Sequence, residues 1–134
     1  MKKELDDALC RDFPLTFRER RASVRSACMC WGFDCDEGWE PIIRRASEKI
    51  ERILGKMVVQ NVANENMPRA SQVKEKYGTL RFYFDCGTDE IYDILHEAEK
   101  QSETTCEECG GVGKLRGKGW YVTLCDSCAE KEKK

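Results

Sequence analysis

Hydrophobic residues recur at helical spacing in two long segments of the chain. The first runs from Trp39 to about Leu54, with Pro41 in its first turn and Gly55 as the expected stop. The second spans about residues 88–103 and begins at Thr88, a residue type that caps helix N-termini. Each segment gathers its buried residues on one face: Ile43, Ala46, Ile50, Ile53 and Leu54 in the first, and Ile91, Ile94, Leu95, Ala98 and Ser102 in the second. Residues 2–13 favour a shorter helix.

The stretch VKEKYGTLRFYF, residues 73–84, alternates between apolar and polar side chains and predicts an antiparallel hairpin. A two-residue turn at Tyr77-Gly78 or at Gly78-Thr79 preserves the alternation. Either turn gives the same two faces: Val73, Leu80, Phe82 and Phe84 on one, with Glu75 at its edge, and Gln72, Lys74, Lys76, Arg81 and Tyr83 on the other. Three cations therefore crowd one sheet face, although like charges on neighbouring strands are destabilising.

Cysteine spacing provides the strongest motif. Cys106-x2-Cys109 and Cys125-x2-Cys128 are separated by fifteen residues, the spacing of a four-cysteine zinc ribbon. Four protein ligands close the coordination shell, so the ion, Zn²⁺, is expected to be structural and not catalytic. A redox function for the CxxC pairs is disfavoured by the presence of two pairs at ribbon spacing.

Five further cysteines lie outside this motif: Cys10, Cys28, Cys30, Cys35 and Cys86. They could form a second metal site, but burial as small apolar side chains is favoured because aromatic residues surround them. Nine cysteines without an apolar leader segment indicate a reducing compartment, and the expected location is the cytoplasm.

The predicted fold is α+β: a small antiparallel sheet packed on two amphipathic helices, with a C-terminal zinc ribbon. The expected organisation is an α+β domain over 1–104, the ribbon over 105–130 and a disordered charged tail over 131–134.

Charge and composition limit the function. The formal net charge of −2 is unfavourable for a protein that coats nucleic acid nonspecifically, and any anion site must be local. His96 is the only histidine and falls at the edge of an apolar stripe, which leaves catalytic triads and dyads without their parts. No segment is apolar enough for a transmembrane helix.

The cationic hairpin face has two interpretations. The side chains could extend into water or pair with acids such as Asp36, Glu37 and Glu40. Alternatively, Lys74, Lys76, Arg81 and Tyr83 bind a phosphate-bearing ligand, with arginine and lysine on the phosphate and the aromatic ring on a base. Additional candidate anion contacts are Arg18, Arg20, Arg21 and Arg25 upstream and Lys114, Arg116, Lys118 and Trp120 at the ribbon tip.

Three blocks of the chain together resemble a family of small uncharacterised proteins encoded by bacteriophages, prophages and some bacteria. The blocks are LCRDFPLTFRERRASVRSACMCWGFDCDEGW, SQVKEKYGTLRFYFD and TCEECGGVGKLRGKGWYVTLCDSC. The resemblance departs at CDEGW, where the family pattern is Cys-Gly-Asp-Gly-Trp. It implies a phage accessory protein in a bacterial cytoplasm and suggests a role in modulating host machinery or host defence, but it implies no specific activity.

Three functions follow from these features. The first is a non-enzymatic protein that binds and sequesters a nucleotide or a nucleotide signal of host defence through the hairpin cations. The second is a zinc-ribbon adaptor for a host protein or nucleic acid. The third is a small nuclease or phosphodiesterase. The oligomeric state is left open, with a homodimer among the alternatives.

Overall fold

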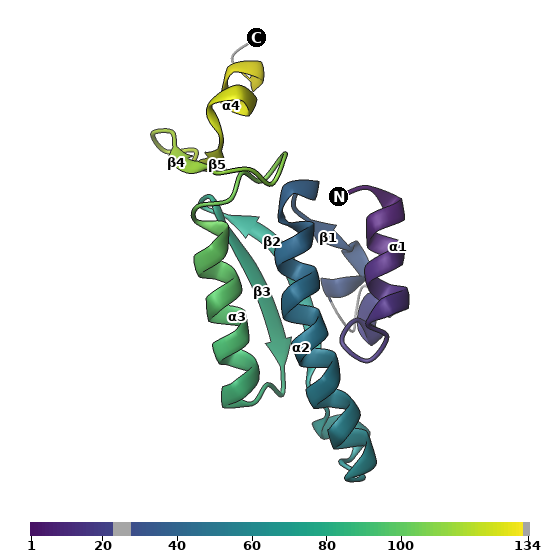
Figure 1. Cartoon of the computed structure of the whole chain (residues 1–134). Helices are drawn as coiled ribbons and strands as arrows, with labels where there is room; N and C mark the ends of the chain where they lie inside the picture. The colour runs from purple at the N-terminus through teal and green to yellow at the C-terminus, as the bar shows by residue number, and fades with distance from the viewer. Residues whose placement is uncertain (23–27, 133–134) are drawn as a thin grey trace.

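The structure, a computed structural model, describes residues 1–22 and 28–132 of the chain. Figure 1 shows a helical and sheet-containing body with the C-terminal segment at one end. The elements are α1 (Lys3–Asp12), η1 (Arg18–Arg21), η2 (Cys28–Trp31), β1 (Phe33–Asp34), η3 (Glu37–Trp39), α2 (Glu40–Val59), η4 (Asn64–Asn66), β2 (Arg69–Lys76), β3 (Thr79–Asp85), α3 (Asp89–Ser102), β4 (Lys114–Arg116), β5 (Val122–Leu124) and α4 (Asp126–Glu132). The fold is α+β, as predicted.

The central sheet has three strands in the order β1-β2-β3. β2 and β3 form the expected antiparallel hairpin, whereas β1 pairs with β2 in parallel, with Phe33 opposite Val73. The sheet is therefore mixed and not purely antiparallel. A strand of two residues is too short to leave an alternating pattern in the sequence, which explains why it was not predicted.

The hairpin turns at Tyr77-Gly78, the first of the two expected positions. Lys74 lies opposite Arg81, and the closing pair is Lys76 with Thr79. Tyr77 and Gly78 have φ angles of +54° and +83°, the left-handed pair that this type of two-residue turn requires. Glycine adopts such angles freely, but they cost a tyrosine about 1–2 kcal/mol.

The first long helix is longer than predicted, because α2 continues through Gly55 to Val59. A glycine inside a helix costs about 1 kcal/mol relative to alanine, which the burial of neighbouring Leu54 can offset. The helix ends at Val59, and Asn61, two residues further on, has a φ of +60° and donates from its backbone N–H to the carbonyl of Val58. Asparagine is, after glycine, the usual residue at such a left-handed helix end.

The second long helix, α3, agrees closely with the prediction. Thr88 Oγ1 accepts a hydrogen bond from the backbone N–H of Ile91 at 3.3 Å and so caps the helix. At the other end, Ser102 Oγ accepts a hydrogen bond from the N–H of Leu80 at 2.9 Å. This second bond fixes α3 beside the outer edge of β3.

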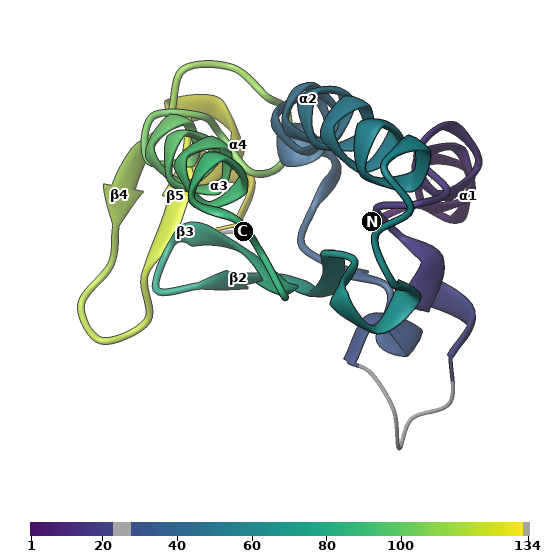
Figure 2. The same ribbon diagram turned by 90° about the horizontal axis from the view of Figure 1, so that it is seen from below.

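The hydrophobic core lies between the helices and one face of the sheet. Figure 2 shows α1, α2 and α3 in a row on the same side of the hairpin. Phe17, from the segment after α1, stacks on Phe82 at 5.9 Å between ring centroids and meets the edge of Phe33 at 5.0 Å. These contacts tie the N-terminal segment to β1 and β3.

The C-terminal module docks on a short segment between β1 and α2. The N–H of Gly38 donates to the carbonyl of Glu107 at 2.6 Å, and the N–H of Asp36 donates to the Glu107 carboxylate at 3.0 Å. The indole N–H of Trp39 donates to the carbonyl of Thr105 at 2.9 Å. Trp39 is fully buried, so the module is anchored in the main core.

Residues 131 and 132, expected in the disordered tail over 131–134, are helical instead, because α4 reaches Glu132. Residues 133–134 fall outside the described part, and the division between 104 and 105 stays a prediction. None of the helices within 1–22 and 28–132 combines the length and the hydropathy of a bilayer-spanning segment.

Gly38 tests the docking contact. A Cβ atom at this position would clash with the backbone carbonyls of Cys106 and Glu107. We expect Gly38→Ala to lower the free energy of unfolding by about 1–3 kcal/mol, measured by urea unfolding of the metal-loaded protein.

The matched control is Gly55→Ala, since a Cβ there meets open space. The free energy of unfolding of that variant should equal the native value or exceed it by up to about 1 kcal/mol. Native stability of Gly38→Ala would contradict the docking contact.

Candidate metal centre and basic surface

The first cysteine pair lies in a turn that brings both sulfurs to one side. The N–H of Gly110 donates to the carbonyl of Cys106 at 2.9 Å, and Gly110 has a left-handed φ of +82°. The N–H of Gly111 donates to the Cys109 sulfur at 3.4 Å. The second pair frames the start of α4, where the N–H of Cys128 donates to the Cys125 sulfur at 3.4 Å.

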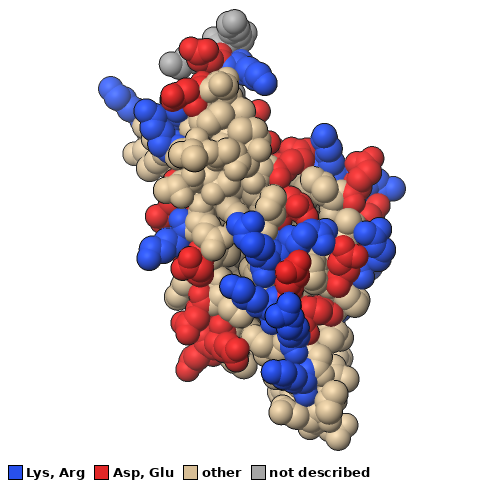
Figure 3. All heavy atoms as spheres, in the orientation of Figure 1, with Lys and Arg blue, Asp and Glu red and all other residues tan. Residues whose placement is uncertain are grey.

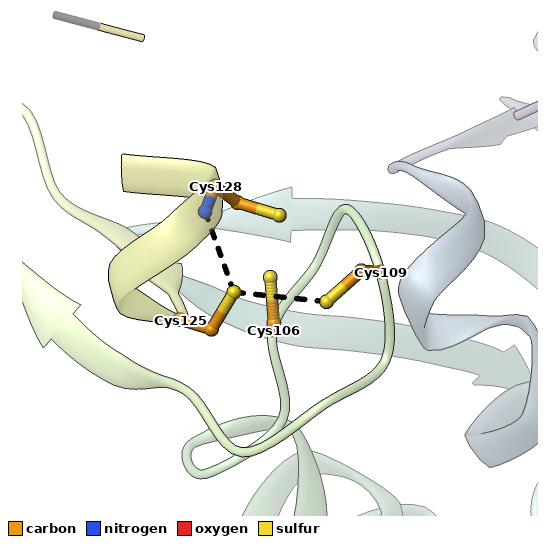
Figure 4. Close-up of side chains that lie close together, drawn as sticks. All are labelled: Cys106, Cys109, Cys125 and Cys128. Carbon is orange, nitrogen blue, oxygen red and sulfur yellow. Dashed lines mark hydrogen bonds between the residues drawn. The ribbon is translucent and has the colours of Figure 1, made fainter. Parts of the chain in front are cut away.

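The two pairs converge on one point, as Figure 4 shows. The four Sγ atoms of Cys106, Cys109, Cys125 and Cys128 all lie within 4.8 Å of one another, and those of Cys109 and Cys125 are 3.7 Å apart. A tetrahedral ion with metal–sulfur bonds of about 2.3 Å has sulfur–sulfur edges of about 3.8 Å. The four thiols could therefore hold one metal ion.

The pKa values of three of the four clustered thiols are shifted, in different directions. Burial raises the pKa of the Cys106 thiol, but hydrogen bonds from the backbone N–H groups of Cys109, Cys125 and Glu108 outweigh it and bring this pKa to about 7. A hydrogen bond between the side chains of Cys128 and Cys125, together with burial, raises the pKa of the Cys128 thiol. Four close thiolates repel one another, so full ionisation requires a positive ion among them.

The ribbon hairpin positions the second cysteine pair. β4 and β5 are antiparallel, with Leu115 opposite Thr123, and β5 leads directly into Cys125. A small apolar cluster supports the site and consists of Cys106, Leu124, Cys128 and Ala129. A short antiparallel hairpin therefore lies between the two cysteine pairs.

The other five cysteines do not assemble into a second group of metal ligands within residues 1–22 and 28–132. Cys10 donates to the Asp6 carboxylate at 3.5 Å, and burial raises its pKa to about 12. Cys35 is buried, and this burial raises its pKa as well. Cys35 is thus buried as expected and Cys10 is half-buried, but Cys28 and Cys86 are exposed, so the prediction of burial is wrong for these two.

The hairpin cations share one face, as predicted, but the fold supplies an acid for one of them. Arg81 Nη1 lies 2.9 Å from a carboxylate oxygen of Glu99 on α3. Lys74, opposite Arg81, and Lys76 have no carboxylate within 4.0 Å in the described part of the chain. Two of the three cations therefore stay available for a ligand, and Tyr83 is 40% exposed beside them.

The upstream arginines serve the fold. Arg18 donates to the carbonyls of Leu15, Met67 and Pro68 at 2.7–3.0 Å. Arg20 forms a bidentate ion pair with Asp6 and also donates to the carbonyl of Cys30. These two guanidinium groups have their donors engaged and are not available as anion contacts.

Arg21 is exposed and lies 3.5 Å from Asp7, and Arg25 lies outside the described residues.

The ribbon tip differs from the upstream segment. Lys114 and Lys118 are exposed, and Trp120 is 82% exposed. Arg116 is engaged, because it pairs with Asp126 and donates to the carbonyl of Leu124. Three of the four predicted tip residues thus face solvent.

The hairpin turn and the ribbon meet. Thr123 Oγ1 on β5 donates to the carbonyl of Gly78 at 2.6 Å, and the side chain of Leu115 on β4 contacts the same turn. Tyr77 lies at this junction but is not among the site residues predicted from the sequence. Its side chain is 64% exposed, and the Lys76 Nζ atom lies 5.6 Å from the centre of its ring. The only signal in the sequence was a bulky tyrosine at a turn position that normally holds asparagine or glycine.

His96 lines a groove of about 280 Å³ between β3 and α3. Its neighbours there are Arg81, Tyr83, Tyr92 and Glu99. The histidine is exposed, as expected for a residue at the edge of an apolar stripe.

No protein-family model, no curated protein and no solved structure matches this chain. Its function is therefore inferred from its own geometry.

The metal site is tested by stoichiometry. Native mass spectrometry should find one metal ion per chain, and Cys125→Ser should lose the ion and melt at a lower temperature, because bound metal contributes directly to folding free energy. Cys28→Ser changes an exposed thiol outside the cluster and should keep both properties. Full metal content in Cys125→Ser would refute the four-sulfur site.

Proposed function

We propose that the protein is a non-catalytic zinc-ribbon protein that binds single-stranded nucleic acid. The observation that carries the proposal is the contact between Thr123 and Gly78, which joins the ribbon to the hairpin turn. Through this contact two separate basic and aromatic segments become neighbours on the surface. The proposal joins two of the functions expected from the sequence, the binding of a phosphate-bearing ligand and the use of the zinc ribbon as an adaptor for nucleic acid.

Zinc is the proposed ion because the donors are four sulfurs. Soft thiolates in a tetrahedral arrangement favour Zn²⁺ over Mg²⁺ or Ca²⁺, which take oxygen ligands. All four positions around the ion are occupied by protein, so no position is open for a reacting water. The ion would therefore hold the ribbon together, and binding would belong to the surface around it.

The proposed binding surface consists of cations and aromatic rings from both segments. Its members are Lys74, Lys76 and Tyr77 on the hairpin and Lys114, Lys118, Trp120 and Tyr121 on the ribbon. Lysines neutralise phosphates, and exposed rings stack on bases without sequence preference. Figure 3 shows basic side chains projecting from the ribbon end of the molecule, at the upper left.

The backbone of the turn supports this use of Tyr77. Its left-handed φ is unfavourable for tyrosine, whereas asparagine or glycine would remove the strain. An exposed aromatic ring kept at such a position suggests a function for the ring itself.

The ligand is proposed to be extended and not a single nucleotide. Arg81, the expected phosphate fork, is occupied by Glu99, and the remaining cations are spread over two elements. A net charge of −2 keeps the overall attraction small, so binding should be weak and depend strongly on salt.

The test is fluorescence anisotropy with a labelled single-stranded 20-mer. We expect a dissociation constant of about 1–100 µM at low salt that weakens as salt rises. Trp120→Ala and Lys118→Glu should each weaken binding by about tenfold, through lost stacking and lost phosphate contact.

Trp31→Ala is the matched control, because Trp31 is 75% exposed but lies on η2, away from the ribbon. Equal affinity in Trp31→Ala and Trp120→Ala would reject the proposed surface. A shift of the melting temperature with a mononucleotide but no binding of the 20-mer would instead favour a nucleotide ligand.

A further inference from the structure

Two rows of opposite charge face each other across a groove between α2 and α3. The groove has a volume of about 460 Å³ and a floor formed by Ile53 and Ile94. One wall, on α2, carries Lys49, Arg52 and Lys56, and the other, on α3, carries Glu90, Asp93 and Glu97. In Figure 3 the acidic side chains gather at the lower left and basic side chains follow the neighbouring helix.

These charged side chains are not paired with one another or with other described residues of the chain. All six side chains are exposed, and none of them forms an ion pair within 4.0 Å among the described residues. Arg44, on another side of α2, shows the contrast: it lies 2.8 Å from both Glu40 and Asp12. The two rows are therefore free to meet charges from another molecule.

We propose that the face formed by α2 and α3 is the interface of a symmetric dimer of this chain. A two-fold axis parallel to the helices places α2 of each copy on α3 of its partner. Each basic row then meets an acidic row, twice in the dimer, and the partly buried isoleucines meet across the centre. The face is self-complementary, as a two-fold interface must be.

The charge pattern also selects this arrangement over the alternative. A two-fold axis lying across the helices would place α2 on α2 and α3 on α3, with like charges in contact. α2 and α3 are antiparallel in Figure 1, and Arg45 donates to Gln101 at 3.3 Å where they meet near the ribbon. In the selected dimer each helix is therefore antiparallel to the partner helix it faces, as in common four-helix bundles.

The exposed end of α2 fits the same interface. α2 extends beyond α3 in Figure 1, and there Val59, which lines a hollow together with Arg52 and Lys56, is 81% exposed. The two overhanging ends would lie at the same end of the dimer and add apolar contact area.

The size of the face predicts a weak dimer. α3 has 14 residues and is thus about 21 Å long, which places the buried area near the lower limit for specific interfaces. Since exposed ion pairs supply much of the attraction, the dimer should dissociate as salt is raised.

Native mass spectrometry and sedimentation of the metal-loaded protein provide the test. At low salt and about 100 µM protein, typical of weak complexes, we expect a species of twice the chain mass of 15.5 kDa. A chain that is monomeric under these conditions overturns the proposal.

Charge reversal distinguishes this interface from any other. Lys49→Glu/Lys56→Glu and Glu90→Lys/Glu97→Lys should each weaken self-association by at least about tenfold, because two of the three charges in the row then repel the row they face. Mixing the two variants should form a heterodimer, since each reversed row then faces its opposite. A mixture that stays monomeric contradicts the proposal, provided both variants keep the native melting temperature.

The control Lys3→Glu/Arg11→Glu changes the net charge by the same amount as the first variant, at two exposed positions on α1. It should dimerise like the native chain. Should it dissociate as much as Lys49→Glu/Lys56→Glu, the effect would belong to net charge, and the proposed interface would be rejected. If the reversed helix variants fail to fold, the combined variant with all four reversals restores complementary rows and must dimerise.

Discussion

The arrangement of this protein depends on the contact between Glu107 and the segment that precedes α2. One residue inside the first cysteine pair accepts the Gly38 N–H with its carbonyl and the Asp36 N–H with its carboxylate. Burial raises the pKa of this carboxyl group to about 7, partly offset by the bond from Asp36. Because Glu107 lies between Cys106 and Cys109 in one short turn, the arrangement of the cysteine ligands and the position of the ribbon are linked.

This linkage connects the metal site to the proposed binding surface. The ribbon contacts the body at two places: at Gly38 beside the cysteines and at Gly78 in the hairpin turn. The second contact joins the ribbon hairpin to the turn that carries Tyr77. None of the described residues of the ribbon belongs to the main core, so an ion held by the four thiols would be the scaffold that keeps the ribbon in place.

Sequence patterns predicted those features of the fold that depend on interactions between residues close together in the chain. The spacing of four cysteines, the cap at Thr88 and the alternation around Gly78 each depend on a few neighbouring residues, and each was predicted correctly. The stop at Gly55 was wrong because burial of Leu54 outweighs a modest propensity cost. The pairing of Arg81 with Glu99, the parallel strand β1 and the charge rows of α2 and α3 require the tertiary arrangement, which no single segment encodes.

Hydrogen exchange of the backbone N–H of Gly38, with and without a chelator, tests the central claim most directly. If the metal turn holds the ribbon on the body, removal of the ion should speed exchange at Gly38 by at least about tenfold while Ile50, in the core of α2, stays protected. Unchanged protection of Gly38 after complete removal of the ion would contradict the link between the metal centre and the docking contact.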